Sequence, residues 1–250
     1  MLTIVKTTIQ SYLMLQELTV IIPVFNEEEN LKRVEKELSE YIKIAKVPTN
    51  VLFVNDGSKD QSQKIIDEIC DSNPNFNFIS FEKNCGLSAA IKAGFDHVTT
   101  SLTGYIDSDL QTDPMEFNLL LEHLDGYDLV TGFRNNRKDS FVKNASSTIA
   151  NGIRRTFTLD GMDDTGCPLK IIRTDYAQRI PMFRGLHRFL PAMILLQNGK
   201  IKQVPIKHYP RMAGTAHFGV WNRLFGPLID CFAYVWMKKK YINYKIAKKG

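Results

Sequence analysis

The sequence predicts an α/β fold with a mostly parallel sheet and helices on both faces. From Glu17 onward, short apolar runs rich in β-branched residues alternate with amphipathic segments of helical period. Such runs are typical of strands buried on both faces, and the alternation is typical of parallel sheets with right-handed crossovers. The composition agrees, because 44% hydrophobic and 24% charged residues in a chain of 250 are ordinary for a globular protein.

Five strands are expected in the first half of the chain, each a short apolar run. They cover residues 18–24, 51–54, 76–81, 102–106 and 128–131. The segments between them repeat apolar residues every three or four positions, which is the period of a helix with one buried face. The residues that mark these helices are Leu31, Val34, Leu38, Tyr41, Ile65, Ile66, Ile69, Cys70, Ile91, Phe95, Val98, Phe117, Leu120, Leu121 and Leu124.

The second half of the chain is less regular. Helices are expected over 141–157 and 187–198, and strands over 167–173 and 201–208. Because no linker or internal repeat is visible, we expect one domain whose later segments cover the sheet. The expected divisions are a leader or tail (1–16), the main domain (17–219) and an amphipathic helix with a basic tail (220–250).

Composition and missing motifs disfavour several classes of protein. The formal charge of +5 is too weak to indicate nucleic-acid binding, and four scattered cysteines indicate reduced thiols rather than a zinc site. GxGxxG after the first strand, GxxxxGK before Ser or Thr, and GxSxG are all missing, which disfavours a dinucleotide site, a P-loop and a nucleophile elbow. Neither a signal peptide nor a transmembrane helix is expected.

Polar side chains follow three of the expected strands, at the point where each strand ends. They lie in Pro23–Glu27, Asn55–Asp60 and Asp107–Gln111. Ligands of such sheets bind beyond the carboxyl ends of the strands, so these segments are expected to face one crevice. Asp56 can accept a hydrogen bond from a base edge, and the two aspartates of the third segment suit a hard divalent cation bound to phosphate. Taken singly, each segment is also compatible with a turn or a helix cap.

These segments resemble those of glycosyltransferase family 2, whose members have the GT-A fold, a Rossmann-like arrangement. TVIIPVFNEEENL resembles the opening strand and turn of the family, and VLFVNDGSKDQS resembles its VDDGSxD segment. GYIDSDLQTDP resembles the DxDLQxxP stretch of enzymes similar to dolichyl-phosphate mannose synthase. TGFRNNR, DTGCP, GLHRFLP and YPRMAGTAHFG resemble segments of polyprenyl-phosphate glycosyltransferases. The resemblance extends from about Leu18 to Met237.

The resemblance implies an inverting glycosyltransferase that moves one sugar from a GDP- or UDP-linked donor to a polyprenyl phosphate, with Mg²⁺ or Mn²⁺ as cofactor. The nucleotide-sugar site would comprise Pro23, Val24, Asn26, Glu27, Asp56, Asp107, Asp109 and Gln111. The metal would be held by Asp107, Asp109 and Gln111. The acceptor phosphate would be bound by Arg134, Arg188 and Arg211. The residues implied in catalysis are Asp109, Arg134 and Arg211.

The chain departs from the family pattern at three places. Asn55 replaces the first Asp of VDDGS, although the Asp56 position is kept. Ala216-His217 replaces a Ser-Lys pair, which weakens the expectation of a phosphate-binding cation there. Gly-Cys167-Pro168 replaces Ser-Gly-Phe, so the acceptor side of the site is expected to differ. The QxxRW segment of processive polysaccharide synthases is missing, which argues against a polymerising enzyme.

The C-terminal segment is expected to be an amphipathic helix that lies on a membrane surface. Apolar residues recur at helical spacing, and the dipeptide Gly226-Pro227 is expected to break or kink this helix. An apolar stripe beside a basic tail suits adsorption to an anionic leaflet, here at the cytoplasmic face. The alternative is that the stripe packs on the sheet and the lysines only keep the tail soluble. The stripe is Trp221, Leu224, Phe225, Leu228, Ile229, Phe232 and Trp236, and the lysines are Lys238, Lys239, Lys240, Lys245, Lys248 and Lys249.

Two other functions remain open from the sequence. One is a family 2 enzyme that glycosylates a soluble glycan, a lipopolysaccharide or a protein. The other is a non-catalytic nucleotide-binding protein that serves as a membrane scaffold, which the intact Asp107-Ser-Asp109 segment disfavours. The nucleotide base, the sugar and the oligomeric state are left undecided by the sequence.

Overall fold

The computed structural model describes residues 16–134, 152, 155–207, 209, 220–244 and 247–248, the side chains of 220–228 excepted. The described strands form one seven-stranded sheet in the order β3-β2-β1-β4-β6-β5-β7. Their bounds are β1 (Leu18–Val24), β2 (Thr49–Asn55), β3 (Phe76–Ser80), β4 (Leu102–Tyr105), β5 (Leu129–Arg134), β6 (Lys170–Arg173) and β7 (Ile201–Ile206). This is the mixed α/β arrangement that the sequence predicted.

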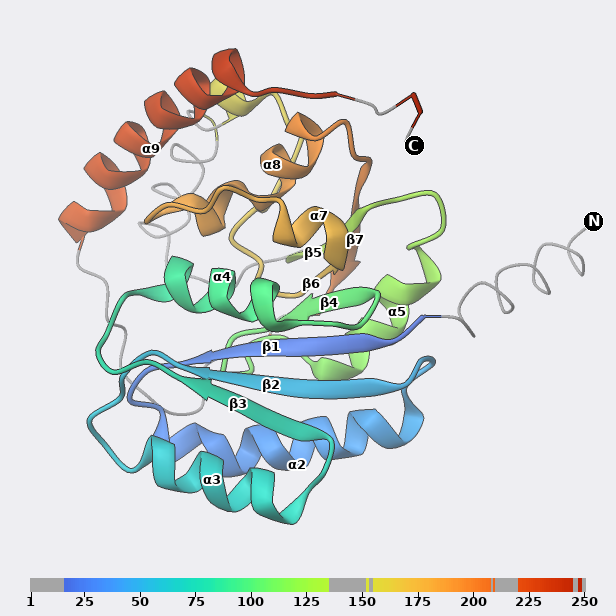
Figure 1. Cartoon of the computed structure of the whole chain (residues 1–250), viewed down its shortest axis with the longest axis vertical. Coiled ribbons are helices and arrows are strands. Elements are labelled where there is room, and N and C mark those ends of the chain that lie inside the picture. Colours follow the sequence, from blue (N-terminus) through green and yellow to red (C-terminus); the bar gives the residue numbers. More distant parts are fainter. Residues whose placement is uncertain are drawn as a thin grey trace, which may run out of the picture.

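Helices connect the strands and cover both faces of the sheet, as Figure 1 shows. The α-helices are α2 (Glu28–Ile44), α3 (Ser62–Ser72), α4 (Leu87–His97), α5 (Phe117–Glu122), α7 (Thr174–Gln178), α8 (Leu190–Leu196) and α9 (Val220–Lys240). Two short 3₁₀ helices are η1 (Pro114–Glu116) and η2 (Leu186–Phe189). The apolar face predicted for the first helix is buried, because Leu31, Val34, Leu38 and Tyr41 are all 0% exposed.

Two hydrophobic cores lie on opposite faces of the sheet. The first packs α2, α3 and α5 against residues such as Val20 and Ile22 of β1, and the second packs α4, α7, α8 and α9 against Ile21. Neighbouring residues of a strand point to opposite faces, so a strand buried on both sides reads as a continuous apolar run. This explains why the strands of the first half could be located from the sequence.

One strand runs against the others. Strand β6 is antiparallel to both β4 and β5, whereas the pairs β1–β2, β1–β4, β2–β3 and β5–β7 are parallel. Lys170 at the start of β6 pairs with Tyr105 at the end of β4, so β6 begins at the edge where β4 ends and returns from it. A uniformly parallel sheet would therefore be the wrong description of this half.

The remaining differences concern the second half of the chain. The predicted strand 167–173 is shorter, and the predicted helix 187–198 is divided into η2 and α8. Helix α9 continues through Gly226 and Pro227, so the break expected at this dipeptide does not occur. The predicted helix 141–157 lies almost entirely outside the described residues.

Candidate active site

The carboxyl ends of three parallel strands form the edge of the sheet where the candidate site lies. Strand β1 lies between β2 and β4, and Val24 at the end of β1 pairs with Asn55 at the end of β2. Ile21 of β1 pairs with Tyr105, the last residue of β4. The segments that follow these strands therefore start at one edge, where sheets of this kind bind ligands.

The loops after β1 and β2 are fastened to each other by hydrogen bonds between backbone and side chains. Asn26 adopts a left-handed conformation (φ 54°), its backbone N–H donates to the Ser58 hydroxyl at 2.9 Å, and its side-chain oxygen accepts from the Lys59 N–H at 2.8 Å. The Glu27 N–H donates to the Ser62 hydroxyl at 3.0 Å. Asn is one of the few residues other than Gly that tolerate this conformation. The predicted residues Asn26 and Glu27 thus lie on a turn that several hydrogen bonds hold in place.

Asp56 is buried, and its carboxylate holds the segment between β3 and α4. It is 2% exposed and accepts hydrogen bonds from the backbone N–H of Cys85 (2.6 Å), that of Gly86 (2.8 Å) and the Asn84 side-chain amide (2.9 Å). Its own N–H donates to the Val24 carbonyl at 2.8 Å. Hydrogen bonds to a carboxylate are stronger than neutral ones, so Asp56 anchors this loop. Its contact with a nucleobase stays a prediction.

Asp107 and Asp109 form an acidic pair just beyond β4. Asp109 is 6% exposed, and its Oδ1 accepts a hydrogen bond from the Gln111 N–H at 3.2 Å. Burial and the neighbouring charge of Asp109 raise the pKa of Asp107 to about 6, against the opposing influence of Tyr105, Lys170 and Arg134. Two carboxylates that repel each other away from bulk water make a favourable environment for a cation.

Two basic side chains, those of Lys170 and Arg134, lie close enough to this pair to affect the pKa of Asp107. Lys170 on β6 is 1% exposed, and its amino group donates to the backbone carbonyl of Cys167. Arg134 at the end of β5 binds Asp164 in a bidentate pair, with Nε to Oδ2 at 2.7 Å and Nη2 to Oδ1 at 2.9 Å. Both cations act on the pKa of Asp107, so they belong to the same charged cluster. Any contact of Arg134 with a phosphate has to use its remaining N–H groups.

The side chain of Arg188 is directed towards Asp230 of α9. Arg188 lies in η2, and its Nη1 is 3.7 Å from Oδ2 of Asp230. Its neighbour His187 shares a 2.8 Å hydrogen bond with the Ser88 hydroxyl, and burial lowers the pKa of His187 to about 3. The structure therefore brings Asp107, Asp109, Gln111 and Arg134 together but turns Arg188 towards α9. Arg211, like Ala216 and His217, lies outside the described residues.

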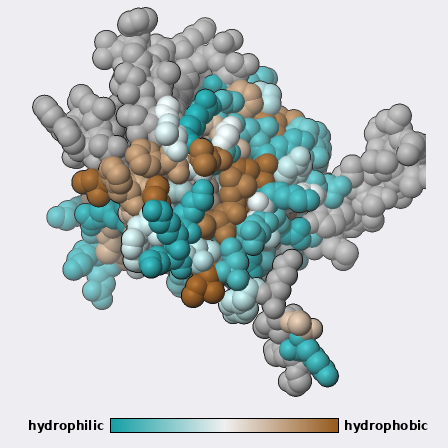
Figure 2. All heavy atoms as spheres, turned by 90° about the horizontal axis from the view of Figure 1, so that it is seen from above, coloured by the Kyte–Doolittle hydropathy of each residue, from teal (hydrophilic) through white to brown (hydrophobic). Residues whose placement is uncertain are grey.

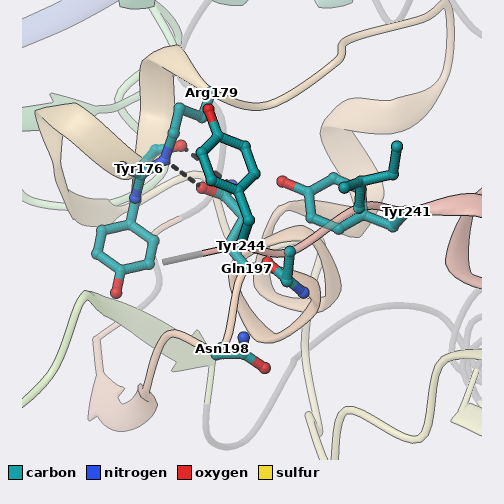
Figure 3. Close-up of a pocket in the computed structure, with 8 residues that line it drawn as sticks. Tyr176, Arg179, Gln197, Asn198, Tyr241 and Tyr244 are labelled. Atoms are coloured by element: carbon teal, nitrogen blue, oxygen red, sulfur yellow. Dashed lines mark hydrogen bonds between the residues drawn. The ribbon is translucent and has the colours of Figure 1, made fainter. Parts of the chain in front are cut away.

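Two hollows on the described surface are lined by residues other than the acidic pair. A cavity of about 760 Å³ is lined by α7, the end of α8 and the chain after α9, including Tyr176, Arg179 and Tyr241 (Figure 3). A second, of about 420 Å³, is lined by the loop that carries Asn26 and Glu27. Neither contains Asp107 or Asp109, so the site is assigned from its chemistry and from the sheet edge rather than from cavity size.

Sequence reasoning missed several residues of this cluster. Tyr105, whose hydroxyl donates to Asp107 at 2.6 Å, resembles any strand aromatic, and Asp164 was noticed only as part of a family segment. Lys170 did carry a signal, because it is a charged residue inside an apolar strand and such residues are rarely buried without partners. The Asn84–Gly86 segment carried none beyond a glycine before a helix.

The donor set fits a divalent cation that is shared with a ligand. Among residues whose placement is described, no three His, Cys, Asp or Glu side chains lie close enough to hold a metal ion by themselves. Asp107 and Asp109 offer oxygen ligands, which Mg²⁺ and Mn²⁺ prefer, and such ions commonly take their other ligands from water and phosphate. All four cysteines are free thiols.

The sheet and its helices define a protein of the mixed α/β class, and comparison with known sequences identifies its family. The model of glycosyl transferase family 2 matches residues 19–180. The chain belongs to this family and is a glycosyltransferase.

Curated relatives match most of the chain. It is 29% identical over 222 residues to undecaprenyl-phosphate 4-deoxy-4-formamido-L-arabinose transferase of Edwardsiella ictaluri, covering 87% of this chain and 68% of the relative. It is 26% identical over 232 residues to dodecaprenyl-phosphate galacturonate synthase of Rhizobium johnstonii, covering 89% and 68%. Both relatives are named for the transfer of a sugar to a polyprenyl phosphate.

Solved structures share the GT-A fold. Glucosyl-3-phosphoglycerate synthase of Mycobacterium tuberculosis, in complex with Mn²⁺, UDP and its product, superposes with a TM-score of 0.69 at 15% identity, covering 91% of this chain and 81% of that one. The mannosyltransferase PcManGT of Pyrobaculum calidifontis, with GDP-mannose and Mn²⁺, gives 0.63 at 14% identity, covering 92% and 70%. At this identity the likeness establishes the fold.

Proposed function

We propose that this glycosyltransferase moves one sugar, with inversion, from a nucleoside diphosphate sugar to a polyprenyl phosphate at the cytoplasmic face of a membrane. The observation that carries the proposal is the acidic pair Asp107 and Asp109 at the carboxyl edge of the sheet, in a chain whose curated relatives are named for polyprenyl-phosphate acceptors. The family and the fold support the donor half of the reaction, and the relatives support the acceptor half.

The acceptor phosphate simplifies the chemistry that the protein has to supply. The second pKa of a phosphate monoester is about 6, so one oxygen is anionic at neutral pH and attacks without a dedicated general base. The protein then has to orient two anions that repel each other. Arg134, with Arg211, is proposed to orient the acceptor, since a guanidinium stays charged and matches phosphate oxygens geometrically. Arg188 would have to leave Asp230 to take part.

The diphosphate side is proposed to depend on a divalent cation. Asp107 and Asp109, with Gln111 nearby, would hold Mg²⁺ or Mn²⁺, and the bound ion neutralises the charge that develops on the diphosphate leaving group. The loops that carry Pro23, Val24, Asn26, Glu27 and Asp56 are proposed to hold the nucleoside. Structural neighbours contain UDP in one case and GDP-mannose in another, so both bases are to be tested.

A donor screen tests the reaction. UDP- and GDP-linked sugars are incubated with a short polyprenyl phosphate, with Mn²⁺, Mg²⁺ or EDTA. We expect transfer from one donor class and its loss in EDTA. Asp109→Ala should lower the rate at least 1000-fold and leave the far-ultraviolet circular dichroism unchanged, because it removes a ligand of the cation. Asp125→Asn, at an exposed turn, is the matched control. Transfer only to a soluble glycan or protein would contradict the proposed acceptor.

Helix α9 is proposed to place the enzyme on the membrane surface. Ile229, Phe232 and Trp236 on one face are 69%, 59% and 67% exposed, whereas Cys231 and Tyr234 on the other face are each 2% exposed and belong to the core. Exposed lysines 238–240 follow on the same helix. A helix with an apolar outer stripe and adjacent cations binds anionic interfaces. No helix within the described ranges is long and apolar enough to cross a membrane.

Helix α9 lies at the outside of the molecule. In Figure 1 it runs next to the layer that contains α8. Figure 2 views the molecule from above and shows brown hydrophobic residues gathered among hydrophilic ones on that face. Helix α9 covers one core with its inner face. On its outer face the ring of Phe232 meets that of Phe157 with 5.3 Å between centroids, yet Ile229, Phe232 and Trp236 all stay more than half exposed.

Vesicle sedimentation tests this surface. The triple variant Ile229→Ser/Phe232→Ser/Trp236→Ser is compared with Ile44→Ser/Phe78→Ser, which removes two exposed hydrophobic residues from α2 and β3. We expect the triple variant to bind vesicles of anionic lipid at least 10-fold more weakly, and the double variant to bind like the wild type. Equal binding by all three proteins would contradict membrane docking through α9.

A further inference from the structure

The carboxylate of Asp107 is held by a residue that the family resemblance did not single out. Tyr105, the last residue of β4, is 5% exposed, and its hydroxyl donates a 2.6 Å hydrogen bond to Oδ1 of Asp107. We propose that Tyr105, held in place by Lys170, is a positioning residue that orients Asp107 towards the divalent cation. This inference rests on the proposed metal-dependent function.

Lys170 fixes the ring of Tyr105 from the neighbouring strand. The two residues are direct partners in the antiparallel register of β4 and β6, so their side chains lie on the same face of the sheet. Nζ of Lys170 is 5.9 Å from the centre of the Tyr105 ring, within the range of a cation–π contact. The antiparallel direction of β6 therefore brings a lysine next to the last residue of β4, two positions before Asp107.

Lys170 is itself held rigidly. Its amino group donates to the carbonyl of Cys167 and lies 3.5 Å from that of Thr165, and the whole residue is 1% exposed. Burial disfavours the charged form of this amino group and lowers its pKa, and the negative charges of Asp164 and Asp107 offset part of that cost. The lysine is thus fixed on one side by backbone carbonyls and stabilised on the other by the acidic cluster.

Fixing Asp107 matters because the plane of a carboxylate rotates easily about its terminal bond. A hydrogen bond to one oxygen selects one orientation, while the other oxygen remains chemically able to bind a cation. Groups that orient metal ligands in this way usually contribute 10- to 100-fold in metal affinity. Without the Tyr105 hydroxyl, Asp107 would have to become ordered each time the cation binds.

The test is Tyr105→Phe, which removes the hydroxyl and keeps the ring beside Lys170. The Mn²⁺ dissociation constant is measured by electron paramagnetic resonance of free Mn²⁺, in the presence of UDP or GDP and without acceptor. We expect about a 10-fold increase in the dissociation constant for Tyr105→Phe. Tyr127→Phe is the matched control, because its ring also lies under a lysine, with Lys202 Nζ at 5.2 Å, and neither residue belongs to the acidic cluster.

The outcomes separate this inference from the function on which it rests. Wild-type affinity in Tyr105→Phe, with the wild type binding Mn²⁺, would overturn the positioning role and leave the proposed function intact. If the wild type bound no Mn²⁺ with either nucleotide, both would fail. A structural role would lower the melting temperature without changing the Mn²⁺ affinity of the folded fraction, so thermal unfolding is recorded alongside. If Tyr105→Phe folds poorly, 3-fluorotyrosine at position 105, which keeps ring and hydroxyl, should restore wild-type affinity.

Discussion

The two halves of the sheet hold their loops by different means. On the side of β1, β2 and β3, hydrogen bonds between side chains and backbone join one loop to the next, as between Asn26 and Lys59 and between Asp56 and Gly86. These bonds hold each loop against the next through backbone N–H groups. Such a region is suited to a rigid part of a ligand, such as the proposed nucleoside.

On the side of β6, β5 and η2, charged side chains bind each other. Arg134 is paired with Asp164 across a short buried contact, and Arg188 lies 3.7 Å from Asp230. An ion pair between side chains can exchange one partner for an incoming phosphate when one of the side chains rotates away. If the proposed function is right, the donor side is held by hydrogen bonds of the loops, whereas the acceptor side depends on cations whose partners are side chains.

Among the variants that compare the two halves, the largest effect is expected for Arg134→Lys, which tests the charged half. Lysine keeps the positive charge but cannot form the bidentate contact with Asp164. Because the displaced charge would misalign the acceptor, we expect kcat to fall about 100-fold, with a smaller change in donor KM. The measurement is steady-state kinetics with each substrate varied in turn.

The control for that variant is Arg155→Lys. Arg155 also pairs with an aspartate, Asp163, but both side chains are largely exposed, at 44% and 66%. Surface pairs contribute little, so kcat should stay within about 2-fold of the wild type. If Arg134→Lys behaved like Arg155→Lys, the charged half would have no special part in the reaction.

A smaller effect is expected for Asp56→Asn, which tests the other half. The amide lacks the negative charge that strengthens the bonds from Cys85 and Gly86, and such bonds contribute about 1.5–3 kcal/mol. We expect the free energy of unfolding to fall by about 2 kcal/mol and the affinity for a nucleoside diphosphate to fall about 10-fold. Denaturant unfolding and calorimetric titration with UDP and GDP measure both.

Asp60→Asn serves as its control, because Asp60 also accepts backbone hydrogen bonds, from Glu28 and Ser62, but is only half-buried. Nucleotide affinity should then remain within about 2-fold of the wild type. A larger loss in Asp60→Asn than in Asp56→Asn would show that burial of the carboxylate is unimportant to this half of the site.

The elements of the first half of the molecule could be predicted closely because each is marked by the pattern of neighbouring residues in the sequence. β1 has the bounds that were predicted, and the buried stripe of α2 is the one that the spacing indicated. A short, continuous run of apolar residues is typical of a strand that is buried on both faces of a sheet. The positions of Asp56 and Asp107 then follow from where the strands end.

The second half could not be predicted as well, because its features depend on long-range pairing. The sequence of β6 does not encode its direction, so the approach of Lys170 to Tyr105 could not be foreseen. Likewise, Pro227 was expected to interrupt α9, but a proline removes only one backbone hydrogen bond, which packing of the helix can offset. The partners of Arg134 and Arg188 could not be predicted either, because Asp164 and Asp230 lie far from them in the sequence.

The smallest effect is expected where the two halves meet, at the hydrogen bond between Ser88 of α4 and His187 of η2. The Ser88 hydroxyl also accepts a hydrogen bond from the Gly185 N–H at 3.0 Å. It therefore joins α4, which follows the segment held by the Asp56 carboxylate, to the turn that carries Arg188. Burial, with the charges of Arg188 and Lys170, lowers the pKa of His187 to about 3, below its ordinary value of 6.5. The folded protein therefore keeps this imidazole neutral at mildly acidic pH.

The sign of the pH effect follows from that pKa. Below pH 6.5 the unfolded chain gains a proton that the folded chain does not, so the contribution of His187 to stability is present above pH 6.5 and is lost as the pH falls towards 3. Each pH unit can remove up to about 1.4 kcal/mol. His187→Gln keeps a hydrogen-bonding partner for Ser88 but does not titrate, so between pH 7 and pH 5 it should lose about 1–2 kcal/mol less than the wild type in urea unfolding. His97→Gln, at an exposed position on α4, should lose as much as the wild type. Equal losses in wild type and His187→Gln would mean that His187 contributes nothing pH-dependent to the junction between the two halves.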